Sequence, residues 1–161
     1  MRWADIIKYA KYSNPEPPYR VVKTEAEWRK QLSPEQYRVT RQKGTEPPYR
    51  NAYCRLYAPG VYTCVCCGNI LFYSSEKYYA ISGWPSFTQP AAKNAIKYAF
   101  DDSYHMHRIE VQCNVCDCHL GHVFHDGPAP AELRYCINSA SLILLKPEDE
   151  PHLEEVRKTL K

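Results

Sequence analysis

Cysteine and histidine gather in the stretch from Cys113 to Asn138, which reads CNVCDCHLGHVFHDGPAPAELRYCIN. It contains a Cys-x-x-Cys pair followed by Cys118, three histidines, two aspartates and a separate cysteine, Cys136. A Cys-x-x-Cys pair is typical of metal ligation, and a separate thiol near a histidine and an acid is typical of a nucleophile. The stretch therefore predicts a metal site close to a reactive thiol.

Two Cys-x-x-Cys pairs occur in the chain, Cys64–Cys67 and Cys113–Cys116. With two residues between the cysteines, one tight turn presents both sulfurs to a tetrahedral ion, and two such turns supply four ligands. Because four thiolates leave no open coordination position, we expect a structural Zn²⁺ that joins two hairpins. Redox-active cysteine pairs and an iron–sulfur site are the alternatives.

Cys136 belongs to no pair and lies in a predicted strand between Arg134 and Asn138. Residues two apart on a strand share a face, so these three side chains should lie together. A neighbouring cation favours the thiolate, which is the reactive form of cysteine. Further partners are expected from the preceding segment, with an acid orienting a histidine: His119, His122 and Asp126. The pattern predicts a catalytic cysteine assisted by a histidine.

The elements that position these residues are predicted to be mainly strands. Capping boxes at Thr24–Glu27 and Ser33–Gln36 predict two helices, and a third is expected over Trp3–Tyr12. Residues 82–87 are expected to form a loop, and 148–161 form a charged tail with apolar residues at helical spacing. Alternating and β-branched residues predict strands at 61–64, 69–73, 95–100, 104–113, 122–124 and 134–145. Within 104–113 the side chains of His105, His107, Ile109 and Val111 should share one face.

Length and composition limit the class of protein. The 161 residues suffice for one domain, and a net charge of +3 gives no reason to expect binding to nucleic acid or to a membrane. No run of eighteen apolar residues occurs, and the charged start MRWADIIKYAKYS does not fit a signal peptide. We therefore expect the reducing cytoplasm, where cysteines serve as ligands and catalysts rather than in disulfides. We also expect a monomer, although no feature of the sequence determines the oligomeric state.

Six motifs in order carry a resemblance to a known family: Gly83-Trp-Pro-Ser-Phe87, Arg108-Ile-Glu-Val111, Cys113-x-x-Cys116, His119-Leu-Gly-His-Val-Phe124, Asp126-Gly-Pro128 and Arg134-Tyr-Cys-Ile-Asn138. From about residue 32 to residue 145 the chain resembles the methionine sulfoxide reductases of type B. The resemblance implies a mainly β fold of two antiparallel sheets, stapled by zinc, with the N-terminal helices packed outside. We divide the single domain into an extension (1–31), the core (32–145) and the tail (146–161).

The resemblance also implies roles for the site residues. Cys136 is the nucleophile, Trp84 lines a pocket for the substrate methyl group, and the reacting atoms are surrounded by His119, His122, Asp126, Arg134 and Asn138. The chemistry agrees, because sulfoxide reduction needs a thiolate, a proton donor and an apolar wall. Cys136 supplies the thiolate, His122 or His119 the proton, and Trp84 with Phe87 or Phe124 the wall. The R epimer is the implied substrate, and Cys136 becomes a sulfenic acid.

Recycling of that sulfenic acid requires a reductant. Many family members carry a resolving cysteine two residues before the motif tryptophan, where this chain has Ser82, whose hydroxyl cannot form a disulfide. Cys66 and Cys118 lie at the knuckles and are expected to be small buried side chains. Cys54, in a loop rich in Pro and Tyr, is the suspected resolving thiol; the alternatives are Cys118, or no second cysteine and a small thiol as reductant. A thioredoxin-type reductant is implied by the family.

Two other classes of protein compete with this interpretation. A zinc-ribbon binding module is the main alternative, but the segments around both knuckles contain no Lys or Arg to contact nucleic acid. A cysteine hydrolase using Cys136, His122 and Asp126 would need an oxyanion hole, and no Gly-rich turn follows Cys136. Whether the substrate is an oxidised protein or free methionine R-sulfoxide stays open.

Overall fold

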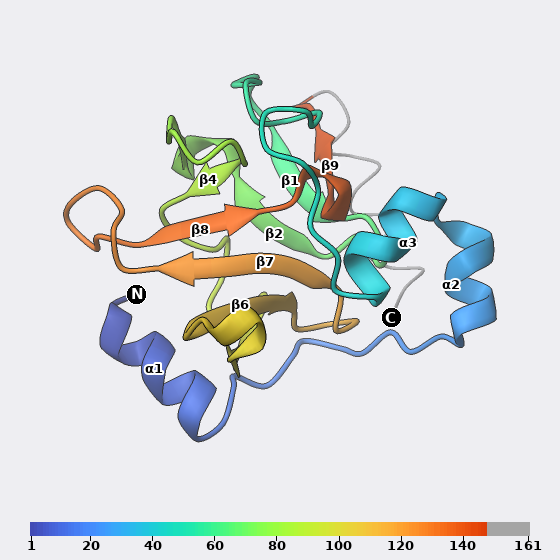
Figure 1. Ribbon diagram of the computed structural model, residues 1–161, viewed down its shortest axis with the longest axis horizontal. Helices are drawn as coiled ribbons and strands as arrows, with labels where there is room; N and C mark the ends of the chain where they lie inside the picture. Colours follow the sequence, from blue (N-terminus) through green and yellow to red (C-terminus); the bar gives the residue numbers. More distant parts are fainter. Residues whose placement is uncertain (148–161) are drawn as a thin grey trace.

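Two antiparallel sheets form the centre of this computed structural model, which describes residues 1–147 (Figure 1). The smaller sheet has the order β2-β1-β9, formed by Ile70–Tyr73, Val61–Cys64 and Leu142–Leu145. The larger has the order β3-β4-β8-β7-β6-β5, formed by Lys77–Tyr78, Ser86–Phe87, Arg134–Ile137, His119–Phe124, Arg108–Cys113 and Ile96–Asp101. The predicted mainly β fold is confirmed, while the helical spacing expected in the tail lies outside the described residues.

Three short helices precede the sheets along the chain, and the first and third of them pack against strands. Both predicted capping boxes are present: the hydroxyl of Thr24 accepts from the amide of Glu27 at the start of α2 (Glu25–Gln31), and that of Ser33 accepts from Gln36 at the start of α3 (Pro34–Arg41). The first helix, α1 (Trp3–Lys11), packs against β5, and α3 packs against β7 (Figure 1). No helix within residues 1–147 has the length and apolar composition needed to cross a membrane.

The prediction of a strand over 104–113 is wrong for its first half. The strand β6 begins only at Arg108, because Tyr104 and His105 have left-handed backbone conformations (φ 56° and 57°) within a short 3₁₀ turn. The carboxylate of Asp101 starts this turn by accepting from the amide of Ser103 at 2.9 Å. His105 and His107 are therefore exposed and do not continue the face formed by the buried residues of β6.

The predicted strand over 134–145 is two strands in different sheets. A 3₁₀ turn at Ser139–Ser141 separates β8 from β9 and carries the chain from the larger sheet to the smaller one. The carboxylate of Glu46 accepts from the amides of Ser139 and Ala140, each at 2.7 Å. These bonds satisfy backbone donors that the crossing would otherwise leave buried and unpaired.

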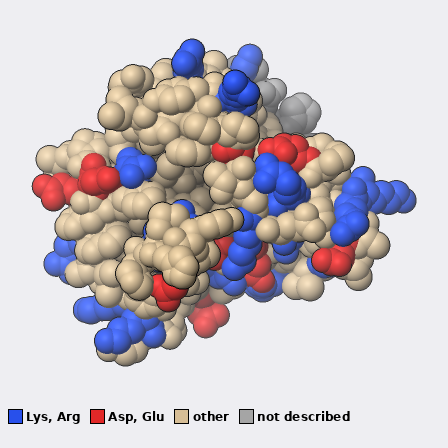
Figure 2. Space-filling view, in the orientation of Figure 1, with Lys and Arg blue, Asp and Glu red and all other residues tan. Residues whose placement is uncertain are grey.

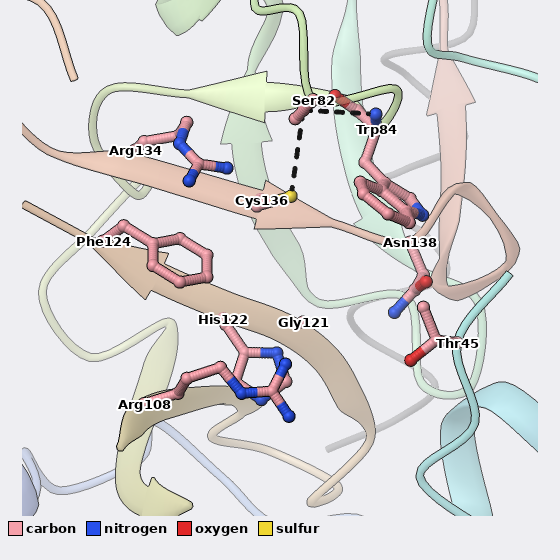
Figure 3. Close-up of a pocket in the computed structure, with 10 residues that line it drawn as sticks. All are labelled: Thr45, Ser82, Trp84, Arg108, Gly121, His122, Phe124, Arg134, Cys136 and Asn138. Atoms are coloured by element: carbon pink, nitrogen blue, oxygen red, sulfur yellow. Dashed lines mark hydrogen bonds between the residues drawn. The ribbon is translucent and has the colours of Figure 1, made fainter. Parts of the chain in front are cut away.

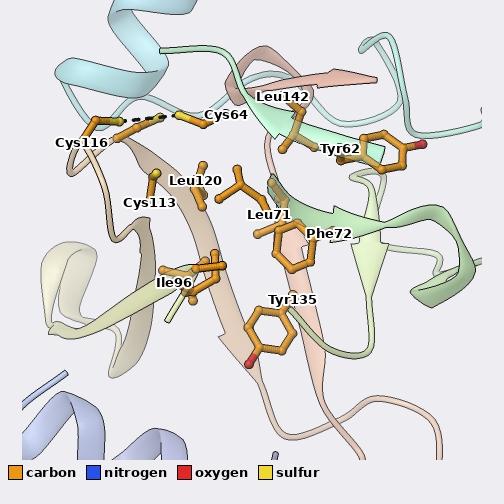
Figure 4. Close-up of a cluster of buried hydrophobic side chains, with 14 of the residues drawn as sticks. Tyr62, Cys64, Leu71, Phe72, Ile96, Cys113, Cys116, Leu120, Tyr135 and Leu142 are labelled. Carbon is orange, nitrogen blue, oxygen red and sulfur yellow. Dashed lines mark hydrogen bonds between the residues drawn. The ribbon is translucent and has the colours of Figure 1, made fainter. Parts of the chain in front are cut away.

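The core lies between the two sheets and is rich in aromatic side chains (Figure 4). Phe72 stacks on Phe87 with ring centroids 4.4 Å apart, and Tyr135 meets Phe72 edge-to-face. All three are fully buried, and burying each such side chain stabilises the fold by roughly 2 kcal/mol. The knuckle cysteines are part of this core, so their thiols lie where the two sheets pack together.

Candidate active site and cysteine cluster

A cavity of about 280 Å³ opens over the larger sheet, with the half-buried Cys136 in its wall (Figure 3). It is lined by Thr45, Ser82, Trp84, Arg108, Gly121, His122, Phe124, Arg134, Cys136 and Asn138. Cys136 on β8 and His122 on β7 are register partners, so both side chains project to the same side of the sheet. The alternation predicted for β8 holds, because Arg134, Cys136 and Asn138 all face the cavity.

Gly121 allows strand β7 to run close beneath the thiol. A β-carbon at this position would lie 2.0 Å from the carbonyl oxygen of Cys136. Any other residue would therefore push β7 away from β8 and change the distance between His122 and Cys136.

The Cys136 thiol has a polar neighbour and a cation close by. Its sulfur lies 4.0 Å from the hydroxyl of Ser82, and Arg134 stands two residues away on the same face. Burial raises the pKa of Cys136, and the charge of Arg134 and the hydrogen bond with Ser82 oppose that rise without cancelling it. Burial and the neighbouring polar groups therefore act on the Cys136 thiol in opposite directions.

Arg134 is fixed by two contacts. Its guanidinium donates to both carboxylate oxygens of Asp126, at 2.8 and 3.1 Å, and lies over the ring of Phe124 at 4.3 Å. The hydrogen bond with Arg134 lowers the pKa of Asp126. Asp126 thus binds the arginine and not a histidine, which differs from the orientation expected from the sequence.

Asp101 takes the position expected for Asp126. Its carboxylate accepts from Nε2 of His122 at 2.7 Å and from Arg108 at 3.3 Å. Burial lowers the pKa of His122, whereas the bond to Asp101 opposes that effect. Sequence reasoning missed Asp101, although the strand–turn–strand pattern around residues 101–103 was recognised. Only the register of β5 against β6, which pairs Asp101 with Arg108, brings this carboxylate to the histidine.

His119 is held away from the cavity. It is buried, its Nδ1 lies 2.5 Å from a carboxylate oxygen of Glu110, and its ring meets that of His122 edge-on at 5.7 Å. Burial raises the pKa of Glu110, but hydrogen bonds from His119 and Gln112 outweigh it and bring the value to about 2. His119 does not line the cavity, so its expected catalytic role gains no support from the geometry.

Trp84 forms one wall of the cavity and is anchored through Glu46. The indole nitrogen donates to the carbonyl of Glu46 at 3.0 Å, and the amide of Glu46 donates to the side chain of Asn138 at 3.1 Å. Asn138 uses its other end to donate to the carbonyl of Leu120 at 3.0 Å. Sequence reasoning did not single out Glu46, because only the long-range fold brings residue 46 beneath the tryptophan.

Of the two phenylalanines expected beside Trp84, one lies in the cavity. Phe124 lines it, whereas Phe87 is fully buried in the core and stacks on Phe72. Phe87 follows Ser86 on β4, and Ser86 is the register partner of Cys136, so alternation turns Phe87 to the opposite face.

Cys54, the suspected resolving thiol, is buried in the loop between α3 and β1 and does not line the cavity. Its amide donates to the side chain of Asn51 at 2.9 Å, and that side chain donates to the carbonyl of Gly83 at 3.0 Å. The loop therefore packs on the turn that carries Ser82. In this structure Ser82, and not Cys54, is the neighbour of Cys136.

The four knuckle cysteines form a compact buried cluster where β6 ends and the turn to β7 begins (Figure 4). Their sulfurs all lie within 4.8 Å of one another, and the pairs Cys64–Cys116 and Cys67–Cys113 are 3.6 Å apart. A tetrahedral ion with bonds of about 2.3 Å to sulfur needs sulfurs about 3.8 Å apart. These thiols therefore fit one tetrahedral metal ion with no room for a substrate.

The two knuckles have backbone turns of the same geometry. In the first, the amide of Gly68 donates to the carbonyl of Cys64 at 2.8 Å; in the second, Asp117 donates to Cys113 at 2.9 Å. Gly68 and Asp117 both have positive φ, at 79° and 66°. The repeated geometry explains how two separate segments present matched pairs of sulfurs.

Comparison with known proteins identifies the family. Residues 32–146 match the model of the SelR domain family. The peptide methionine sulfoxide reductase MsrB of Cellvibrio japonicus is 55% identical over 120 residues, which cover 74% of this chain and 86% of that protein. The protein of the same name from Acinetobacter baylyi is 53% identical over 133 residues, covering 83% of this chain and 94% of that protein.

The chain therefore belongs to the SelR domain family and is an oxidoreductase. The resemblance to methionine sulfoxide reductases of type B, predicted from the motifs, is confirmed.

Proposed function

We propose that this chain reduces methionine R-sulfoxide to methionine, with Cys136 as the nucleophile. The observation that carries the proposal is the half-buried thiol in a cavity that has an apolar wall on one side and a histidine on the other. A sulfoxide has matching parts: an electrophilic sulfur, a basic oxygen and an apolar methyl group. The names of the relatives support the same substrate class.

The first step transfers oxygen from substrate to enzyme. The Cys136 thiolate attacks the sulfoxide sulfur, the sulfur–oxygen bond breaks as the oxygen is protonated, and water or the released hydroxide then attacks the Cys136 sulfur. Methionine leaves with its sulfur reduced by two electrons, and Cys136 becomes a sulfenic acid, oxidised by two electrons. Arg134 supports the thiolate in this step, because its charge lowers the pKa of Cys136 against the effect of burial.

His122 is the proposed proton donor to the sulfoxide oxygen. Its Nε2 is bound to Asp101, which leaves Nδ1 as the ring nitrogen with no hydrogen bond to any residue of 1–147. The negative charge of Asp101 stabilises the imidazolium that donates the proton, in opposition to the burial that lowers the pKa of His122. Asp101 is a positioning residue, because it acts through the histidine.

Trp84 and Phe124 form the wall for the substrate methyl group. An indole offers a broad apolar surface with little conformational freedom to lose. Asn138 has both ends of its amide engaged, with Glu46 and with Leu120. We assign it the task of holding the loop that carries Trp84 in place, rather than contact with the sulfoxide oxygen.

The four-cysteine cluster is the proposed site of a structural Zn²⁺, held by Cys64, Cys67, Cys113 and Cys116. The bound ion would fix the two knuckles to each other and so hold the smaller sheet against the larger one. The cluster is fully buried and outside the cavity, so a bound ion would take no part in the reaction.

Recycling is proposed to pass through a disulfide between Cys54 and Cys136, which a thioredoxin-type dithiol then reduces. A disulfide brings two α-carbons within about 7 Å, so the loop of Cys54 must move toward the cavity. Cys54→Ser should lose turnover with thioredoxin and keep turnover with dithiothreitol. If thioredoxin-driven turnover persists in Cys54→Ser, this disulfide is not on the path, and Cys118→Ala tested in the same assay shows whether Cys118 resolves instead.

A zinc-ribbon module and a cysteine hydrolase fit the geometry less well. On the face shown in Figure 2, Lys and Arg lie among Asp and Glu and form no continuous basic stripe. A hydrolase triad would pair the histidine with Asp126, which instead binds Arg134. The monomeric state and the cytoplasmic location stay predictions.

One assay tests the proposed function. The protein is incubated with dithiothreitol and each epimer of a dabsylated methionine sulfoxide, and the product is separated by chromatography. Methionine from the R epimer alone is the expected result. Equal reduction of both epimers, or no reduction of either, would contradict the proposal.

A further inference from the structure

A second cavity, of about 440 Å³, adjoins the cavity of the proposed active site. It is lined by Tyr78, Tyr79, Ala80, Ile81, Ser82, Asp126 and Arg134. Ser82 and Arg134 line both cavities, so the two spaces meet beside the thiol of Cys136. Ser82 lies on the side of Cys136 away from His122 (Figure 3). The second cavity therefore adjoins the active site on the side opposite the proposed proton donor.

The strand pairing of the larger sheet places both cavities on one face. Tyr78 on β3 is the register partner of Ser86 on β4, and Ser86 is the register partner of Cys136 on β8. Cys136 in turn pairs with His122 on β7. Directly opposed residues of antiparallel strands project to the same face, so these four side chains form one row across four strands. A polypeptide that crosses the strands along this row would pass over both cavities.

Apolar side chains on the loop before Ser82 form one wall of the second cavity. Tyr79 and Ile81 have exposed fractions of 73% and 81%. Single exposed apolar residues are ordinary on a protein surface, but these two border one cavity beside a reactive thiol. Removing apolar surface from water is favourable, so an apolar group that enters this cavity is stabilised by covering both side chains.

Hydrogen bonds fix the backbone of the loop that carries this apolar wall. The hydroxyl of Tyr49 donates to the carbonyl of Ile81 at 2.5 Å, and the amide of Tyr49 donates to the carbonyl of Gly83 at 2.8 Å. A loop that is already ordered has little conformational freedom to lose when a ligand binds. The exposed side chains of this loop are therefore held ready for contact.

An ion pair forms the polar end of the second cavity. Two hydrogen bonds join the carboxylate of Asp126 to the guanidinium of Arg134, so the two charges compensate each other. No other Lys, Arg, Asp or Glu among residues 1–147 lines this cavity. A charged group that entered would lose its hydration without gaining a free partner of opposite charge, whereas an apolar group has no such cost. The cavity therefore favours an uncharged, apolar side chain.

We propose that the second cavity binds an apolar side chain next to the methionine sulfoxide of a peptide or protein substrate. This inference rests on the proposed reductase activity and identifies a polypeptide, rather than the free amino acid, as the preferred substrate. Only two methylene groups separate the sulfur of methionine from its α-carbon, so the main chain of the substrate lies at the mouth of the active-site cavity. Consecutive α-carbons are about 3.8 Å apart, which brings the side chain of an adjacent residue within reach of the second cavity.

A set of short peptides measures this preference. Each peptide is blocked at both ends and carries one methionine R-sulfoxide, with leucine or serine at the position before it or after it. All are reduced with dithiothreitol, so that docking of a protein reductant plays no part in the rate. Wild type should have a kcat/KM at least about tenfold higher with leucine than with serine at one of the two positions.

Removal of the apolar wall should abolish the preference. The Tyr79→Ser/Ile81→Ser double variant should reduce the leucine and serine peptides with a kcat/KM ratio near one. Its melting temperature should match that of wild type, because both side chains are exposed. The matched control is Tyr12→Ser/Val22→Ser, which removes apolar side chains with exposed fractions of 76% and 81% outside both cavities and should keep the preference.

The possible outcomes separate this inference from the proposed function. Equal kcat/KM for leucine and serine peptides in wild type would overturn the binding site and leave the reductase activity standing. A preference that the Tyr79→Ser/Ile81→Ser variant retains would also overturn it, and loss of only thioredoxin-driven turnover in that variant would assign the surface to the reductant. No reduction of any peptide by wild type would overturn the reductase activity and this inference together.

Discussion

The cysteine cluster and the cavity use the same functional group under opposite conditions. In the cluster, Cys64, Cys67, Cys113 and Cys116 are almost completely buried and each sulfur faces other sulfurs. In the cavity, Cys136 is half-buried and its sulfur faces a hydroxyl and open space. Their burial and neighbours suit the cluster thiols to metal ligation, and its accessibility suits the Cys136 thiol to the proposed nucleophilic attack.

A second pair of sites repeats the contrast with histidine and carboxylate. His119 and Glu110 are both buried and lie behind the cavity, whereas His122 lines it and its partner Asp101 is partly exposed. The two pairs lie on neighbouring positions of the same sheet and differ in access to substrate. The following substitutions test which cysteines and which histidine–carboxylate pair serve the reaction and which stabilise the fold.

The largest effect on activity is expected from Cys136→Ser. A hydroxyl is hardly ionised near neutral pH, so reduction of methionine R-sulfoxide with dithiothreitol should fall by more than about a thousandfold. The metal content and the melting temperature should not change, because Cys136 lies outside the cluster. Activity within tenfold of wild type would show that another residue attacks the sulfoxide.

The opposite behaviour is expected from Cys113→Ser. Loss of one thiolate should release the metal and lower the free energy of unfolding by more than about 4 kcal/mol, since binding of metal to such a site contributes to folding. Denaturant unfolding together with elemental analysis measures both effects. A stable Cys113→Ser variant that keeps its metal would contradict the assignment of the cluster as structural.

Asp101→Asn and Glu110→Gln compare the two histidine–carboxylate pairs. Asp101→Asn should lower kcat by about 10- to 100-fold with little change in stability, because the proton donor loses its charged partner. Glu110→Gln should leave kcat nearly unchanged and lower the free energy of unfolding by about 1 to 3 kcal/mol. Equal losses of kcat in the two variants would show that both histidines serve the reaction.

The Glu110 pair also predicts a dependence of stability on pH. The pKa of Glu110 falls from its ordinary value of 4.5 to about 2 on folding, so its stabilising effect is complete above pH 4.5 and is lost as the pH falls toward 2. The difference in stability between wild type and Glu110→Gln should shrink over that range. A difference that stays constant from pH 5 to pH 2 would contradict the lowered pKa of Glu110.

The smallest effect is expected from Arg134→Met. The arginine lowers the pKa of Cys136, so its loss should move the pH profile for alkylation of Cys136 to higher pH and slow alkylation several-fold at pH 7. Arg134→Lys keeps a positive charge and serves as the matched control. An unchanged profile in Arg134→Met would show that the cation does not activate the thiol.

Local patterns in the sequence predicted the parts of the site that depend on neighbouring residues. Alternation along β8 placed Arg134 and Asn138 beside Cys136, and the spacing of the knuckles predicted the four-sulfur cluster. The parts that depend on register or on chain crossings were missed or misplaced. Asp101 reaches His122 only through strand pairing, and Glu46 reaches Trp84 only because the loop after α3 folds over the cavity.

Long-range packing explains the remaining differences between sequence and structure. The residues from 134 to 145 read as one strand, because nothing local marks the crossing at Ser139 that Glu46 stabilises from a distant segment. Phe87 was a reasonable choice for the cavity by residue type, but pairing of Ser86 with Cys136 directs it into the core. Cys66 and Cys118 were expected to be small buried side chains; they are buried, and their sulfurs lie within 4.8 Å of that of Cys64.

Trapping the oxidised enzyme after one turnover tests the central claim that Cys136 attacks the sulfoxide. The Cys54→Ser variant is mixed with one equivalent of methionine R-sulfoxide and dimedone without reductant, and its intact mass and peptide map are measured. The account predicts one methionine released per chain and one dimedone adduct, located on Cys136. Release of methionine with the adduct on another cysteine, or with no adduct at all, would contradict it.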